Sequence, residues 1–106
     1  MILAALEIVT TAALAEVRLN DIPMAVVGER DGNGRAFLPV PAHLVRGPNV
    51  LAARLRPVGG EEGRIEIRIA EFRESDDYFS GAGREMAAIA WTAAEGEAIR
   101  QQPFRR

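Results

Sequence analysis

The chain has 106 residues, of which 48% are apolar and 26% are charged, and its net charge is −2. These values are typical of one folded domain, taken here as residues 1–106, and they exclude a disordered chain, which would combine few apolar residues with a high net charge. All 13 basic residues are Arg, balanced by 15 Asp and Glu, and there is no Cys, so the sequence predicts no nucleic-acid binding, no attraction to an anionic membrane, no disulfide and no Cys-based metal site.

The first segment, MILAALEIVTTAALAE, is apolar and contains an A-x-A pattern at Ala13–Ala15. A signal peptide would need a basic start and an uninterrupted apolar stretch, but Glu7 interrupts the run and the first basic residue is Arg18. The run is also too short for a membrane-spanning helix. We therefore expect a cytoplasmic protein by default, and an extracellular location stays open.

Apolar residues at every second position predict strands at residues 2–11, 16–19, 49–56 and 65–69. In the first of these, Ala and Leu would also suit a helix, but the β-branched run Ile8–Thr11 favours a strand. Each predicted strand has one apolar face, so we expect a sheet with one buried and one solvated side.

Turn sequences separate these strands at short intervals. Asn20–Pro23, Asp31–Gly34 and Gly47–Asn49 are rich in Gly, Asn, Asp and Pro, and Gly59–Gly63 is expected to close a hairpin. Pro39 and Pro41 flank Val40, and because Pro cannot donate to a sheet, this segment predicts an edge strand or its exit. A single helical turn is expected at residues 42–45.

The C-terminal third is less regular. Residues 74–84 predict a loop, and residues 85–94 fit both helical spacing and the face of a strand. The all-β surroundings favour the strand, and Phe104 is placed in a last short strand or tail. Together these patterns predict an all-β fold, namely a single jelly-roll-like β-sandwich of about six to eight short strands.

No catalytic or metal-binding pattern stands out. His43 is the only histidine, and we interpret it as a partly exposed turn residue. Asp31–Gly34 resembles the start of a calcium loop, but the ligands that should follow are missing, so we interpret it as a hairpin turn. Glu71, Glu74 and the nearby Asp pair are interpreted as a solvated acidic loop. The sequence therefore predicts no metal, no cofactor and no catalytic residue.

Candidate ligand-binding residues lie in this same polar loop. Tyr78 and Phe79 could stack on the face of a sugar ring, and Asp76 and Asp77 could supply polar contacts to it. Trp91 lies in an apolar segment and is assigned to the core.

The strands at residues 49–56 and 64–69 carry four outward Arg residues. If the two strands were neighbours, these residues would line one face of the sandwich, namely Arg54, Arg56, Arg64 and Arg68. Arg is enriched at protein interfaces. The interleaved Glu66 instead favours a solvated face held by salt bridges.

Residues 16–56 resemble the N-terminal sugar-binding domain of family 2 glycoside hydrolases, a galactose-binding-like jelly roll. The family pattern joins a strand with an Asn turn, a Gly-bearing loop, an aromatic residue and an "L..G.N.L" strand opening. The matching residues here are Val17, Leu19, Asn20, Gly34, Phe37, Leu44, Gly47, Asn49, Val50 and Leu51. Asp21 stands where the family has a turn glycine. Because the family's catalytic residues lie in a separate barrel domain, the resemblance implies a non-catalytic module.

The sequence thus predicts a non-catalytic ligand-binding module, with carbohydrate as the first candidate ligand. The alternative is a protein–protein interaction or structural module, of the phage, secretion-system or inhibitor type. It would use a face of the sandwich or an edge strand, through which the chain could also form a homo-oligomer. A small enzyme built on His43 and the acidic loop is a third, weaker hypothesis. No nucleic-acid or membrane partner is expected.

Overall fold

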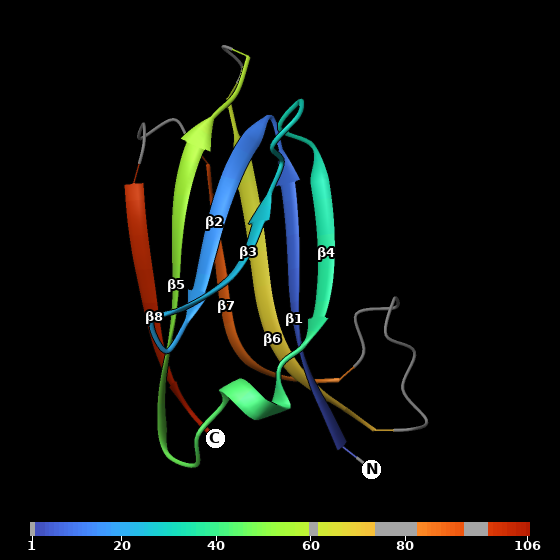
Figure 1. Cartoon of the computed structure of the whole chain (residues 1–106), viewed down its shortest axis with the longest axis vertical. Helices are drawn as coiled ribbons and strands as arrows, with labels where there is room; N and C mark the ends of the chain where they lie inside the picture. Colours follow the sequence, from blue (N-terminus) through green and yellow to red (C-terminus); the bar gives the residue numbers. More distant parts are fainter. Residues whose placement is uncertain (1, 60–61, 74–82, 93–97) are drawn as a thin grey trace.

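A computed structural model describes residues 2–59, 62–73, 83–92 and 98–106 of the chain (Figure 1). Within these ranges the chain forms eight strands and one 3-10 turn. They are β1 (Ile2–Thr11), β2 (Ala13–Leu19), β3 (Ile22–Val27), β4 (Gly34–Pro39), η1 (Pro41–His43), β5 (Pro48–Pro57), β6 (Arg64–Arg73), β7 (Arg84–Thr92) and β8 (Ala98–Arg105). The predicted all-β sandwich of six to eight strands is confirmed.

The strands form two four-stranded antiparallel sheets. Sheet I has the order β4-β1-β6-β7, and sheet II has the order β3-β2-β5-β8. Figure 1 shows the two sheets stacked face to face, with β2, β3, β5 and β8 in the nearer layer. Among the described residues no helix has the length and apolar character needed to cross a membrane.

The connectivity has an internal symmetry. The first four strands correspond in order to the last four, so that β1 matches β5, β2 matches β6, β3 matches β7 and β4 matches β8. Exchanging each strand with its match converts the strand order of sheet I into that of sheet II. The equivalent strands β2 and β6 carry similar four-residue segments, Glu16–Leu19 (EVRL) and Glu66–Ile69 (EIRI). In both segments the apolar residues are buried and the Glu is exposed. The two halves of the chain therefore build the same four-strand unit twice.

The core lies between the central strands of the two sheets. Every second residue of β1, β2, β5 and β6 points inward, as the alternating pattern predicts. The inward side chains of these four strands that are at most 2% exposed are Ala4, Leu6, Ile8, Ala13, Ala15, Val17, Leu19, Leu51, Ala53, Leu55, Ile65, Ile67 and Ile69.

The β2–β3 hairpin and the end of β4 also match the sequence patterns. Asn20 and Asp21 form the two-residue β2–β3 loop with φ values of 52° and 64°, as expected for a type I′ turn, which Asn and Asp tolerate. β4 is an edge strand that ends at Pro39, and the chain then makes the 3-10 turn Pro41–His43. The strand interpretation of residues 85–94 is confirmed by β7 over residues 85–92, and residues 93 and 94 lie outside the described residues.

Two expected hairpins are corrected. The Asp31–Gly34 turn leads from β3 in sheet II to β4 in sheet I, and the Gly59–Gly63 segment leads from β5 in sheet II to β6 in sheet I. Turn residues reverse the chain, but they do not choose which sheet the next strand joins. In the first case the loop is held against the β1–β2 link, because the Ala13 amide donates to the Gly32 carbonyl at 2.9 Å.

Candidate functional site

The ligand-binding residues predicted from the sequence are not placed by the structure. Asp76, Asp77, Tyr78 and Phe79 lie outside the described residues, and so does the side chain of Trp91. Their proposed role in sugar binding therefore stays a prediction.

The aromatic rings that the structure describes are packed against the protein. Phe72 is fully buried and Phe104 is 8% exposed. The half-buried ring of Phe37 lies 6.0 Å from that of Phe72, and both pack with Ala5 and Ala70 in a small apolar cluster on the outer side of sheet I. All three described rings are buried or half-buried, whereas a sugar-stacking platform needs an exposed ring.

The candidate catalytic and metal-binding residues do not form a site within the described residues. The Nδ1 atom of His43 is buried and has no hydrogen-bond partner there. Glu71 forms salt bridges with Arg84 at 3.0 Å and with Arg106 at 3.8 Å. The Asp31 carboxylate accepts a hydrogen bond from the Asn33 amide at 2.9 Å, which shapes the turn. The described residues contain no group of three or more His, Cys, Asp or Glu residues that could hold a metal ion.

The prediction that four Arg residues line one face of the sandwich is wrong, because β5 and β6 belong to opposite sheets. Arg54 and Arg56 lie on the outside of sheet II, whereas Arg64 and Arg68 lie on the outside of sheet I. The local salt bridges on β6 are present as expected, with Arg64 and Glu66 2.6 Å apart. Neither outer face therefore carries the continuous Arg row that the sequence suggested.

Edge strands expose backbone groups that can pair with another chain, so folded proteins usually protect them with Pro, charge or bulges. All four edges here have such features, but on β7 they are confined to its start, where Arg84 and Glu85 are charged and the pairing with β6 shifts register at Met86. β3 contains Pro23 and a register shift opposite Val17 and Arg18, and β4 carries Arg35 and ends at Pro39. These features make β3 and β4 poor templates for strand addition.

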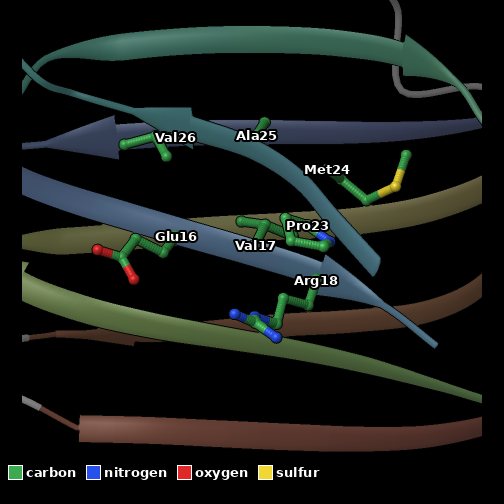
Figure 2. A pocket seen from close by; sticks show the side chains of 7 residues that line it. All are labelled: Glu16, Val17, Arg18, Pro23, Met24, Ala25 and Val26. Carbon is green, nitrogen blue, oxygen red and sulfur yellow. The ribbon is translucent and has the colours of Figure 1, made fainter. Parts of the chain in front are cut away.

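Figure 2 shows the irregular part of the β3 edge, where a shallow depression of about 300 Å³ lies beside β2. Pro23 lies next to Val17, while the charged groups of Glu16 and Arg18 point away from Met24. The polar side chains do not converge on a common point. We interpret this depression as a consequence of the bulge and not as a ligand site.

The β8 edge is protected in a different way. Pro103 interrupts its donor row, and Arg100 pairs with Ala53, so that its side chain lies on the inward face of the strand. A charged residue on the inward face of an edge strand opposes the addition of another strand.

The β7 edge has none of these protections along Ala87–Thr92. This stretch contains no charge, no Pro and no Gly, and it pairs in regular register with Arg64–Ile69 of β6. Within the described residues β6 is its single pairing partner. Since alternate residues of an antiparallel strand direct their N–H and C=O groups to opposite sides, half of these backbone groups point to the open edge.

A shallow groove runs beside this edge. It has a volume of about 330 Å³ and is lined by Ala88–Ala90 of β7 and Arg100–Gln102 of β8. Ala88 and Ala90 are exposed on the outer side of β7, and Ile89 is buried on its inner side. An extended peptide could therefore approach the β7 backbone without meeting a large side chain of β7 on the outer side.

The sequence identified β7 as a strand but did not show that it is an edge, because strand order depends on contacts between distant residues. The uncharged run from Met86 to Thr92 was the one available signal. Comparison of the chain with protein-family models, with curated proteins and with solved structures found no match in any of the three.

Proposed function

We propose that this protein is a non-catalytic protein–protein interaction module that binds an extended segment of a partner by strand addition to β7. The observation that carries this proposal is the contrast between β7 and the other three edges. Among the described edge strands, Ala87–Thr92 is the longest run that pairs in regular register and contains no charge and no Pro.

Strand addition draws its affinity from main-chain hydrogen bonds and its specificity from the pockets for alternate side chains. Along β7 the outward positions Ala88 and Ala90 are small, so they allow close approach of a neighbouring strand. The inward position Ile89 lies at the rim of the core, where an apolar side chain of the partner would be shielded from water. The groove beside β8 would hold the added strand.

Carbohydrate binding, and with it the resemblance to the sugar-binding domain of family 2 glycoside hydrolases, stays a prediction from the sequence. It depends on Tyr78 and Phe79, which lie outside the described residues. The β7 edge is the surface that the described residues support best.

The proposal is tested by selecting linear peptides from a displayed random library on the immobilised protein. The bound peptides are then measured against a variant carrying Ala88→Lys and Ala90→Lys, because Lys on an edge strand opposes strand addition. We expect the selected peptides to lose at least tenfold in affinity for this variant.

The matched control carries Val50→Lys and Ala52→Lys. These residues have the same spacing and also face outward, but they lie on β5, which is paired on both sides. The control should bind the peptides as the unmodified protein does. Failure to select any peptide, or equal loss of affinity in both variants, would contradict strand addition at β7.

A further inference from the structure

The outer faces of the two sheets differ in charge. Directly paired residues of antiparallel strands have their side chains on the same face, so the registers assign each charged residue to a side. On the outer side of sheet I three Glu are balanced by three Arg, namely Glu7, Glu66, Glu85, Arg35, Arg64 and Arg68. On the outer side of sheet II there are one Glu and four Arg, namely Glu16, Arg18, Arg54, Arg56 and Arg105. Among the described strand residues, positive charge is therefore in excess on the outer face of sheet II, although the whole chain has a net charge of −2.

Exposed aliphatic side chains lie on the same face of sheet II. Val26 of β3 is opposite Glu16 of β2, which is opposite Arg54 of β5. Arg54 in turn is opposite Ile99 of β8, so one row of side chains crosses all four strands. Val26 is 50% exposed and Ile99 is 67% exposed. The opposed Glu and Arg are thus flanked on both sides by aliphatic groups that contact water.

Two further Arg residues extend this row along the strands. Arg18 follows Glu16 by two residues on β2, and Arg56 follows Arg54 by two residues on β5. Because β2 and β5 are antiparallel, the exposed side chains of Arg18 and Arg56 lie on opposite sides of the row. The spacing of strands and residues gives the group a span of about 14 Å in each direction. We call this group the sheet II patch, and it comprises Glu16, Arg18, Val26, Arg54, Arg56 and Ile99.

We propose that the sheet II patch binds the surface of a partner protein on which carboxylates and apolar side chains alternate. Arg is enriched at protein interfaces, because its stem packs on apolar groups while its guanidinium binds a carboxylate. Complementary charge also steers the encounter and selects the partner. This proposal goes beyond strand addition and is independent of it, since β7 belongs to the other sheet.

The composition of the patch favours a protein over a nucleic acid or a sulfated polysaccharide. Exposed Val26 and Ile99 gain from contact with apolar groups, which a polyanion does not supply. Glu16, in the middle of the patch, would repel a polyanion. A second copy of the chain fits less well, because two such patches would bring Arg against Arg and the described outer face of sheet I has balanced charges.

The probes that test this proposal are two displayed libraries of linear peptides, selected on the immobilised full chain. One library mixes Asp and Glu with Leu, Val and Phe in random order, and the other has Lys and Arg in place of the acids. We expect binders from the acidic library alone. Their affinity should fall at least tenfold for a variant carrying Arg18→Glu and Arg56→Glu.

The matched control carries Arg35→Glu and Arg64→Glu, which change the net charge equally but lie on the outer side of sheet I. It should bind the acidic peptides as the unmodified protein does. A second variant, Ile99→Ser, keeps every charge of the patch at an exposed position and should lower the affinity at least threefold.

The outcomes separate the patch from its alternatives. Equal losses in the two charge variants, or no binders from the acidic library, would overturn the proposal. So would an unchanged affinity of Ile99→Ser, or binding of a heparin fragment that depends on Arg18 and Arg56 when the peptides do not bind. Peptides that lose affinity only for the variant with Lys at positions 88 and 90 would belong to the β7 edge, so that strand addition would stand while the patch would not.

Discussion

The side-chain amide of Asn20 donates a hydrogen bond to the side-chain oxygen of Asn49 over 2.9 Å, although the two residues are 29 positions apart. Asn49 is 2% exposed, and all of its side-chain hydrogen-bonding groups are used. Its oxygen also accepts from the Val45 amide, and its nitrogen donates to the carbonyls of Val45 and Gly47. The pair therefore ties the start of β5 to the β2–β3 turn.

Asn20 completes this link on its own side. It donates to the His43 carbonyl at 2.9 Å, and its oxygen accepts from the Val50 amide at 2.9 Å. The two side chains thus hold together the β2–β3 turn, the end of the 3-10 turn and the loop before β5. Asn49 thus holds the loop before β5 by hydrogen bonds to its backbone.

We predict that Asn49→Ala lowers the free energy of unfolding by about 2–3 kcal/mol, because it removes the hydrogen bonds of a buried side chain to the part-buried backbone groups of Val45 and Gly47 and to Asn20. Urea denaturation followed by circular dichroism measures this change. Gln101→Ala, at an exposed position of β8, is the control and should have little effect. A melting temperature of Asn49→Ala equal to that of the unmodified protein would contradict a structural role of the pair.

The coupling between the two Asn side chains can be measured separately. Asn20 has a positive φ of 52°, so Asn20→Gly removes its side chain and still fits the turn. A double-mutant cycle of Asn20→Gly and Asn49→Ala should give an interaction energy of about 1 kcal/mol or more. Additive effects of the two substitutions would show that the 2.9 Å contact adds nothing to stability.

Gly28 is predicted to be the least replaceable glycine of the β3–β4 loop. Its φ is +90°, and a Cβ atom at this position would meet the Ala13 carbonyl oxygen at 2.1 Å. Gly59 shares a positive φ of +74° but has open space around it. Both Ala variants carry the cost of the left-handed backbone, about 1–2 kcal/mol, and only Gly28→Ala adds a clash with the backbone. Thermal unfolding should show Gly28→Ala to be clearly the less stable, and equal losses would count against the observed loop conformation.

The Glu71 carboxylate links the two sheets at one end of the sandwich. It lies on β6, its side chain is 14% exposed, and it contacts Arg106 just after β8 as well as Arg84. We predict that Glu71→Gln lowers stability by about 1 kcal/mol, since the charged pair is partly shielded from water. Glu66→Gln is the control, because Glu66 and its partner Arg64 are both half exposed. Chemical denaturation at low and high salt measures the loss of stability in each variant. Equal losses for Glu71→Gln and Glu66→Gln would contradict this role of Glu71.

The inward faces of the four central strands could be predicted from the sequence, and those of the edge strands β3 and β4 could not. β1, β2, β5 and β6 each bury one complete face, so apolar residues recur at every second position. β3 and β4 are only partly covered, and their patterns of buried and exposed residues do not alternate cleanly. Partial burial removes the selection for strict alternation on which such a prediction depends.

The arrangement of the strands was also beyond local reasoning. Arg54 and Arg64 belong to consecutive strands, and proximity in sequence suggested proximity in space. In the structure β5 pairs with β2 and β8, whereas β6 pairs with β1 and β7. The candidate β7 edge follows from this order alone, so residues 84–92 by themselves could not show that β6 is the single partner of this strand among the described residues.

Hydrogen exchange of the β7 amides with and without a selected peptide tests the central claim most directly, because it observes the backbone groups that would pair. If an extended peptide adds to this edge, the amides of alternate residues in Ala87–Thr92 should exchange more slowly when the peptide is bound. The amides of the β3, β4 and β8 edges should not change. Exchange at β7 that the peptide leaves unchanged, or protection that develops at another edge instead, would contradict the assignment of β7 as the edge that accepts a strand.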